Sequence, residues 1–488
     1  MKLITKLAFC ALFLLGSLSM ADAKRPQSLP HVNSTVDGYR GIWFTLGQHQ
    51  ANGLDKYSGG LGTYTMKHIP MAVYAPEVNK TFFVYGGTPA DGELYLQCMM
   101  GCYDHNTGLL QKPRVVYDKG QNGVLDPHDN PIVQIDRDGY VWMFVSGRGK
   151  KRNGIRLRST KPYDITSFKY VDEEIMAYPQ VHYSDERGFF LFFTRYDGKR
   201  QTCFQTSPTG KKKSWSEYTK IANIKEGDEK LSGHYQITNR IGDKLVSAFN
   251  RHINGNPDTR TNIYFVQSED WGKTWTTIDG KPLEFPLTTR VNDALVRDYQ
   301  SQGCNCYIKD VNFDKDGNPV ILYVISKDHM TGPEGRVPGT KEGGRLWYTL
   351  HWNGTEWIEC QFAESSHAYD SGSIWTDGNE WTIIGPTEQG PQEWGAGGEI
   401  AVWKSRNEGK SWKKVRQLTY DSQYNHGYVR RPQDANEGFY AFWGDGHSEE
   451  VSPSRLYFCT KDGDVFMMPA EMTEEWAAPI PVYQEKRK

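Results

Sequence analysis

Histidine, tyrosine and arginine side chains recur beside short apolar runs along this chain, and their types suit proton transfer next to an anion. An imidazole with its unperturbed pKa of about 6.5 can accept a proton at neutral pH, and a phenol can donate one. A guanidinium pairs with a carboxylate or sulfate in a fixed, two-pronged geometry. The side chains singled out are His128, Arg148, Tyr178, Arg195, His234 and Tyr235.

Together these residue types favour an acidic sugar as ligand. Neutralising the carboxylate of a uronate makes its C5 proton more acidic, which is what β-elimination requires. His128 and Tyr178, helped by Arg195 and Tyr235, could compose such a site. The alternative is that polar side chains only plug the solvated mouth of a ring-shaped β fold.

A second histidine of interest lies near the start of the chain, in the stretch GIWFTLGQHQANGLDKYSGGLG at residues 41–62. A short strand-like run passes there into a polar, glycine-rich segment that carries Gln48 and His49. A histidine in such a segment is either a functional group or a solvated loop residue. The residues alone leave both possibilities open.

Seven apolar runs define the elements that must position these side chains. Their central positions are spaced by about 60 residues, and Asp-Gly or Glu-Gly turns precede four of them. Each run is followed by another strand-like segment, so the repeat predicts a seven-bladed β-propeller with four antiparallel strands per blade. The runs are Thr81–Tyr85, Val141–Val145, Phe189–Phe193, Lys244–Phe249, Val320–Ile325, Trp381–Ile384 and Phe439–Trp443.

In a propeller blade the first strand lines the central axis, so its entry and the exit of the second strand lie at the same face. The singled-out histidines and tyrosines stand at predicted entries, and the two arginines at predicted exits. We therefore expect them at one mouth of the axis.

Two short motifs support the same architecture. Residues 268–275 (SEDWGKTW) and 405–412 (SRNEGKSW) resemble the Asp-box hairpin of sialidase-like propellers, and residues 207–215 look like a degenerate copy. In that hairpin a polar side chain and a glycine fix the turn, and the closing tryptophan packs between sheets. The motif indicates architecture and says almost nothing about function.

The N-terminal segment and the net charge limit the class of protein. Residues 1–23 have the charged start, apolar run and small-residue end of a secretory signal peptide. We expect residues 24–66 to form an N-terminal segment with a strand and a glycine-rich loop, and residues 67–488 to form the propeller. A formal net charge of −2 implies no attraction to nucleic acid or to a membrane. The expected location is secreted or periplasmic.

Seven cysteines follow the signal peptide, and this odd number leaves at least one thiol free. Cys304 and Cys306 could join a structural metal site with His252 or His329, although buried thiols are the simpler interpretation. No cofactor is expected, and a structural metal beside these two cysteines stays open.

Longer stretches resemble a known group of exported seven-bladed propellers. They are GYRGIWFTLGQ (38–48), DKYSGGLGTYTMKHIPMAVYAPE (55–77), TFFVYGGT (81–88), YDSQYNHGYVRRP (420–432) and SRLYFC (454–459). The group contains ulvan lyases and the α-L-rhamnosidases of glycoside hydrolase family 145, which remove rhamnose from rhamnose-α-1,4-glucuronate ends. The resemblance covers nearly all of the chain after the signal peptide.

The resemblance implies two different sites. The rhamnosidases use one histidine of the N-terminal segment, which corresponds to His49, or in another register to Gln48. The ulvan lyases use an axial cluster that matches His128, Tyr178, Arg195 and Tyr235, but carry a second histidine where Arg148 stands here. That departure puts eliminative cleavage at this face in doubt.

Our main expectation is a secreted enzyme that hydrolyses the linkage between L-rhamnose and D-glucuronate, with His49 as the catalytic residue. Its binding residues would be Gln48, His128, Arg148, Tyr178, Arg195, His234 and Tyr235. One alternative is a lyase of the ulvan type acting through His128, Tyr178 and Arg195. Another is a glycan-binding propeller without catalysis. The expected partner is in each case an acidic polysaccharide that contains rhamnose and uronate.

Overall fold

The computed structural model describes residues 33–45, 53–61, 66–124, 126–196, 200–340 and 343–482. In these ranges the regular structure is β-strand, apart from five short 3-10 helices. The helices are η1 (Gly120–Asn122), η2 (Pro127–Asp129), η3 (Ile253–Gly255), η4 (Pro257–Thr259) and η5 (Gly332–Gly335). The chain is therefore all-β, as predicted.

Six sheets are blades in which antiparallel strands follow one another in chain order. Five blades have four strands and the last has five. The first three blades are β9 (Pro131–Ile135), β10 (Tyr140–Val145), β11 (Gly154–Pro162), β12 (Phe168–Glu174); β13 (Ala177–Ser184), β14 (Gly188–Tyr196), β15 (Arg200–Ser207), β16 (Thr219–Lys220); and β18 (His234–Ile241), β19 (Lys244–His252), β20 (Arg260–Ser268), β22 (Leu295–Arg297).

The other three blades complete the order along the chain. They are β23 (Asn305–Phe313), β24 (Pro319–Ser326), β25 (Arg345–Trp352), β26 (Trp357–Ser365); β27 (Ser373–Asp377), β28 (Glu380–Glu388), β29 (Glu399–Ser405), β30 (Lys413–Gln417); and β31 (Asn425–Arg430), β32 (Ala441–Gly446), β33 (Leu456–Cys459), β34 (Val465–Met467), β36 (Ile480–Val482).

The prediction of seven blades is wrong, because the described residues form six; the expected four antiparallel strands are found in five of these. The first apolar run enters instead a composite seven-stranded sheet whose strands come from three parts of the chain. Its strands are β1 (Ser34–Thr35), β4 (Ala72–Ala75), β5 (Lys80–Gly87), β6 (Gln97–Asp104), β7 (Leu109–Gln111), β8 (Arg114–Asp118) and β35 (Trp476–Ala477). A local repeat could not show that β1 and β35 would join it, since both pairings span long stretches of sequence.

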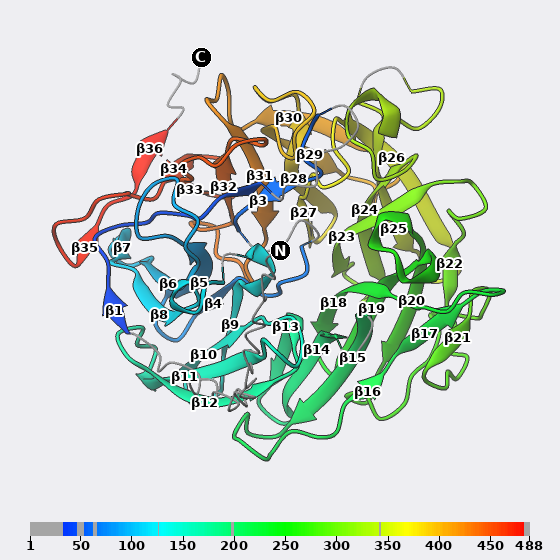
Figure 1. Ribbon diagram of the computed structural model, residues 1–488, viewed down its shortest axis with the longest axis horizontal. Coiled ribbons are helices and arrows are strands. Elements are labelled where there is room, and N and C mark those ends of the chain that lie inside the picture. The colour runs from blue at the N-terminus through cyan, green and yellow to red at the C-terminus, as the bar shows by residue number, and fades with distance from the viewer. Residues whose placement is uncertain are drawn as a thin grey trace, which may run out of the picture. The chain divides into compact units, whose positions relative to one another are not determined.

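Figure 1 shows the sheets following one another around a central axis, with the first strand of each blade innermost. Isolated bridges join early residues to late ones, because Gly41 pairs with Ser454 and Val73 pairs with Gln433; Gly41 also pairs with Gly87. Two short pairs complete the sheets, β2 (Phe44–Thr45) with β3 (Ser58–Gly59) and β17 (Ala222–Lys225) with β21 (Leu287–Thr289). The N-terminal segment thereby closes the ring.

Continuous apolar runs arise because each blade is covered on both faces. In β14, Phe189, Leu191 and Phe193 belong to one buried cluster, and Phe190 and Phe192 belong to another. Successive side chains of a strand point to opposite faces, so neighbouring residues pack against different blades. A fully buried strand of this kind reads as an unbroken apolar stretch rather than as an alternation.

The three segments that resemble Asp boxes form their turns through the same kind of hydrogen bond, from a glycine N–H to a serine hydroxyl. The hydroxyl oxygen of Ser268 accepts a hydrogen bond from the Gly272 N–H at 2.8 Å, and Ser405 accepts one from Gly409 at 2.9 Å. In the degenerate copy Ser207 accepts from Gly210 at 2.8 Å. These hydroxyls satisfy the turn amides that strand pairing leaves without partners.

Two further observations concern the cysteines and membranes. All seven cysteines after residue 23 are free thiols, and Cys306 is fully buried. Among the described residues, no group of three or more His, Cys, Asp or Glu side chains could hold a metal ion. Nor does this part of the chain contain a helix long and apolar enough to span a bilayer.

Candidate active site

The first functional side chain at the axis is His128, which lies on η2 just before the innermost strand β9. It is 3% exposed, and its Nδ1 bonds to Asp126 while its backbone N–H donates to the same carboxylate at 3.0 Å. Because a carboxylate can only accept, Nδ1 carries the proton and Nε2 is the basic nitrogen. Burial lowers the pKa of His128, and the Asp126 charge opposes that shift.

Tyr178 faces this imidazole from the start of β13, with ring centroids 5.6 Å apart. Its hydroxyl accepts a hydrogen bond from Arg148 Nη1 at 2.8 Å and lies 3.0 Å from the Tyr196 hydroxyl. Burial raises the pKa of Tyr178 well above its ordinary value, and the Arg148 charge works against this. The phenol is therefore protonated at neutral pH and is held in one position as a proton donor.

Arg148 follows β10 and connects the two groups. Its Nε lies 3.5 Å from Asp126 Oδ2, and its guanidinium lies 5.1 Å from the Tyr196 ring centroid. With 31% of its side chain exposed, it is more open to solvent than His128 or Tyr178. This is the position from which a guanidinium can reach an anionic group arriving from outside.

Asp126 is the carboxylate that organises the site. Besides His128 and Arg148 it accepts a hydrogen bond from Arg152 Nη2 at 2.8 Å. Burial alone would raise its pKa, but the His128 imidazole and the Arg148 charge hold the pKa of Asp126 well below its usual range. Asp126 is thus a fixed anion rather than a proton donor.

Cationic and aromatic side chains continue the cluster along the axis. The Tyr235 ring meets Tyr178 edge to face at 5.5 Å. Lys67 Nζ lies 4.4 Å and the Arg260 guanidinium 5.1 Å from the Tyr235 ring centroid. All four side chains are at most 2% exposed. The interior behind His128 and Tyr178 therefore holds a buried arginine and a buried lysine, and burial lowers the pKa of Lys67 well below its ordinary value.

The N-terminal segment reaches the same end of the axis. The Tyr57 ring lies 6.3 Å from His128 and 4.9 Å from Tyr369, and Lys56 forms an ion pair with Asp258. Gln48 and His49 lie outside the described residues, so their predicted roles stay predictions.

Two predicted residues are not brought into this cluster. Arg195 donates to Glu174 at 2.9 Å and stacks on Tyr218, toward the outer strands of its own blade and the preceding one. His234 is fully buried: its Nε2 accepts from the Ile224 N–H and its Nδ1 donates to the Asn250 carbonyl. Both imidazole nitrogens of His234 are thereby occupied by backbone.

Sequence reasoning missed Asp126, Tyr196 and Arg260. Asp126 stands two residues before His128, and this spacing lets one carboxylate bind both the backbone and the side chain of the histidine. Tyr196 is adjacent to Arg195, and because successive strand residues point to opposite faces, a shift of one residue exchanges which of them faces the axis. Both residues could have been identified from these sequence positions. No sequence signal pointed to Arg260, since it starts the third strand of its blade, whereas site residues were expected at the first two.

Comparison with known proteins supplies the family. The sequence profile of the BNR repeat-containing family matches residues 97–365, which is more than half of the chain. The chain belongs to the BNR repeat-containing family. The match covers the blades that carry His128, Tyr178 and Tyr235.

Curated relatives of this BNR-repeat protein include three ulvan lyases. The chain is 23% identical to the ulvan lyase of Nonlabens ulvanivorans over 67% of its own length and 73% of that protein. It is 24% identical to the ulvan lyase of Alteromonas sp. (strain LOR) over 48% of its own length, and spans about half (52%) of that relative.

Among solved structures, the BNR-repeat protein is similar to an ulvan lyase of polysaccharide lyase family PL25 bound to -[GlcA(1-4)Rha3S]-. The TM-score is 0.67 at 18% identity, and the alignment covers 88% of this chain and 96% of that one. At this identity the likeness establishes the shared fold.

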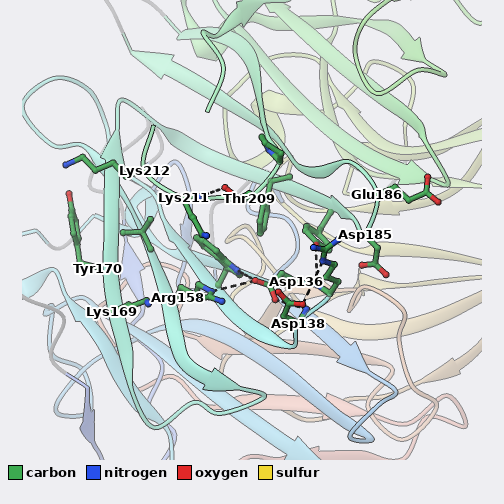
Figure 2. Close-up of a pocket in the computed structure, with 16 residues that line it drawn as sticks. Asp136, Asp138, Arg158, Lys169, Tyr170, Asp185, Glu186, Thr209, Lys211 and Lys212 are labelled. Atoms are coloured by element: carbon green, nitrogen blue, oxygen red, sulfur yellow. Dashed lines mark hydrogen bonds and ion pairs between the residues drawn. The ribbon is translucent and has the colours of Figure 1, made fainter. Parts of the chain in front are cut away.

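The outer side of the BNR-repeat protein carries a separate groove of about 580 Å³ between the blades β9–β12 and β13–β16. Figure 2 shows Lys169, Lys212 and Tyr170 along one side and Asp185 and Glu186 along the other. None of the predicted site residues lines it. Its cations and carboxylates are mixed, so the groove has no clear charge preference.

Proposed function

We propose that this BNR-repeat protein is a lyase that cleaves an acidic polysaccharide containing uronate by β-elimination. The observation that carries the proposal is one arrangement: the His128 imidazole, held by Asp126, faces the Tyr178 phenol, held by Arg148. A base, a proton donor and a partly exposed cation are the three groups that elimination beside a carboxylate needs.

The steps follow from these positions. Arg148 binds the uronate carboxylate and thereby stabilises the negative charge that develops when C5 loses its proton. His128 Nε2 takes that proton, and its positive charge is stabilised by Asp126. The C4–O bond then breaks, Tyr178 gives its proton to the leaving oxygen, and a C4–C5 double bond remains. Arg148 can subsequently help Tyr178 regain a proton from solvent by stabilising the phenolate.

The same geometry argues against hydrolysis by a carboxylate pair at this mouth. Such hydrolysis needs one carboxylic acid with a raised pKa and a second carboxylate about 5–10 Å away. Here Asp126 is engaged by His128, Arg148 and Arg152, and Asp258 is engaged by Lys56. Although burial acts to raise it, the pKa of each of these two carboxyls is lowered by its cationic partners.

The relatives support the class of substrate. Three curated relatives are ulvan lyases, and the similar PL25 structure holds -[GlcA(1-4)Rha3S]-. We therefore propose a polysaccharide of rhamnose and glucuronate as the substrate, and export as the route by which the protein meets it. Removal of rhamnose by hydrolysis through His49 is the competing proposal, with the family resemblance in its favour.

One assay separates the two reactions. The protein is mixed with ulvan and with a rhamnose-capped glucuronate oligosaccharide, and ultraviolet absorbance and free rhamnose are followed together. Both reactions release free rhamnose from the capped end, because in elimination the bridging oxygen leaves with the rhamnose. Only elimination raises the absorbance, through the new double bond, so free rhamnose without a rise in absorbance indicates hydrolysis. We expect His128→Gln to lower the elimination rate about 100- to 10,000-fold. His105→Gln, remote from the axis, is the matched control and should keep the wild-type rate.

A further inference from the structure

The outer groove of about 580 Å³ between the blades β9–β12 and β13–β16 takes no part in the proposed elimination. Two of the turns that line it, at residues 136–138 and 185–186, follow the ends of β9 and β13. His128 and Tyr178 stand at the starts of the same two strands. The groove is therefore separated from the candidate active site by the length of a strand, and it lies between blades rather than on the axis.

The third turn of the groove is the degenerate Asp box at residues 207–215, which departs from the two regular boxes. In the regular boxes, Asp270 or Asn407 stands two residues after the serine and accepts a backbone N–H at 2.9 or 3.0 Å. Thr209 stands at that place in the degenerate copy, and residues 211–213 are three consecutive lysines. Lys213 has a φ of +69°, which glycine adopts more readily. The formation of the turn does not by itself explain this sequence.

One wall of the groove is cationic and aromatic. Lys169 and Tyr170 of β12 lie there with Lys212 of the degenerate box, as Figure 2 shows, and Lys211 lines the groove between the walls. Among the described residues, no ion pair joins the three lysines to a carboxylate. The Tyr170 side chain is 37% exposed, so its ring offers a face to a ligand. Aromatic faces of this kind suit the apolar face of a sugar ring.

The opposite wall carries acceptors. Asp185 and Glu186, in the turn between β13 and β14, are both exposed and line the groove. A third carboxylate, Asp136, is used by the protein itself, because it accepts from Trp142 Nε1 at 2.8 Å and from the Tyr140 N–H at 3.0 Å. Ionised carboxylates can only accept hydrogen bonds, so the Asp185 and Glu186 side chains suit hydroxyl donors.

The distribution of charge narrows the class of ligand. Taken together the charges of the groove nearly balance, but cations and carboxylates stand on separate walls. A neutral glycan would leave the lysines without a partner, and a densely charged polyanion would be repelled by Asp185 and Glu186. A sugar chain with widely spaced carboxylates or sulfates and many hydroxyls fits both walls. The volume lies within the range of about 300–1,000 Å³ that is usual for ligand sites.

We propose that this groove is a second, non-catalytic binding site for an acidic polysaccharide. Lys169 and Lys212 pair with carboxylate or sulfate groups of the chain, Tyr170 packs against a sugar ring, and Asp185 and Glu186 accept sugar hydroxyls. The identity of the polysaccharide, a polymer of rhamnose and glucuronate, rests on the proposed function. Binding here keeps a long polymer on the protein between cleavage events at His128.

The test is native electrophoresis of the full chain in gels that contain ulvan, or dextran as a neutral polysaccharide. The chain carries His128→Gln and Arg148→Gln, which leave the ulvan intact and remove the partly exposed cation of the proposed active site. The mobility at several ulvan concentrations gives the dissociation constant. We expect ulvan but not dextran to retard the protein. In this background, adding Lys169→Gln and Lys212→Gln should weaken binding about 5-fold or more.

The regular Asp boxes provide a matched control. Lys273 and Lys410 directly follow the glycines of these boxes, are exposed, and lie outside the groove. The pair Lys273→Gln and Lys410→Gln removes the same number of positive charges and should leave the affinity for ulvan unchanged. Tyr170→Ala tests the aromatic contact without changing the charge, and it should weaken binding about 3-fold or more.

The outcomes separate this site from the proposed activity. Weaker binding by the Lys169 and Lys212 variant, with unchanged binding by the control pair, supports the groove site. Equal affinities of these two variants, no retardation by ulvan, or equal retardation by dextran would each overturn it. If the wild-type chain eliminates no substrate but binding still depends on Lys169 and Lys212, the lyase proposal fails and the groove site stands.

Discussion

At the scale of single residues, the basicity of His128 depends on Asp126. The carboxylate fixes the proton on Nδ1 and raises the pKa of the imidazole against the effect of burial. Replacement by asparagine keeps an acceptor but removes the charge, so the pKa of His128 falls further. The base becomes weaker, and its deprotonated form persists to lower pH.

Asp126→Asn is therefore expected to lower kcat about 100-fold or more and to move the acid limb of the kcat profile to lower pH. The measurement is the elimination rate between pH 4 and pH 8 for the wild type and the variant. Asp104→Asn, on the outer part of the composite sheet, provides the control. An unchanged acid limb would show that His128 is not the titrating base.

The site could be predicted only in part from the residues. His128, Tyr178, Arg148 and Tyr235 do lie close together, because strand order and direction place blade entries and exits at one end of the axis. The misplacement of Arg195 and His234 has a different cause. Which of two adjacent side chains faces the axis depends on the register of a strand, and an error of one residue reverses it.

At the scale of elements, the apolar runs locate the strands well. Six of them lie entirely within β5, β10, β14, β19, β24 and β28. The composite sheet could not be anticipated, since β1 pairs with β8 and β35 pairs with β7 over long separations. Local periodicity identifies strands, whereas sheet membership depends on contacts between the two ends of the chain.

The Asp-box turn after β20 offers a paired test of packing. Gly272 and Gly280 have nearly equal positive φ angles, +82° and +83°. A Cβ on Gly272 would lie 2.5 Å from the Phe190 ring, whereas a Cβ on Gly280 would meet nothing within 4 Å. Both alanine variants share the strain of the left-handed backbone, which costs about 1–2 kcal/mol.

We expect Gly272→Ala to lower the free energy of unfolding by about 1–3 kcal/mol more than Gly280→Ala does, because only the former overpacks the blade interface. Urea unfolding of the two variants and the wild type gives the difference. Equal losses would mean that the turn moves freely away from Phe190.

At the scale of the whole molecule, covering each blade on both faces buries histidines in neutral form. Burial lowers the pKa of His182, His234 and His426 to about 3. Their hydrogen bonds fit the neutral ring: in His426, for example, Nδ1 accepts from Trp443 Nε1 at 2.9 Å. These side chains stabilise the blades without taking part in the proposed chemistry.

This burial sets the direction of the pH dependence of stability. In the unfolded chain each of these histidines takes up a proton below its ordinary pKa of about 6.5, whereas in the folded chain it stays neutral down to about pH 3. The unfolded state therefore binds more protons in this window, and stability falls on acidification by up to about 1.4 kcal/mol per histidine per pH unit. Urea unfolding at pH 7.5, 6, 5 and 4 measures how steeply the free energy of unfolding changes with pH. His426→Gln should reduce this slope by about the contribution of one bound proton. Stability that is constant or increases from pH 6.5 to pH 4 would contradict the neutral, buried state of these imidazoles.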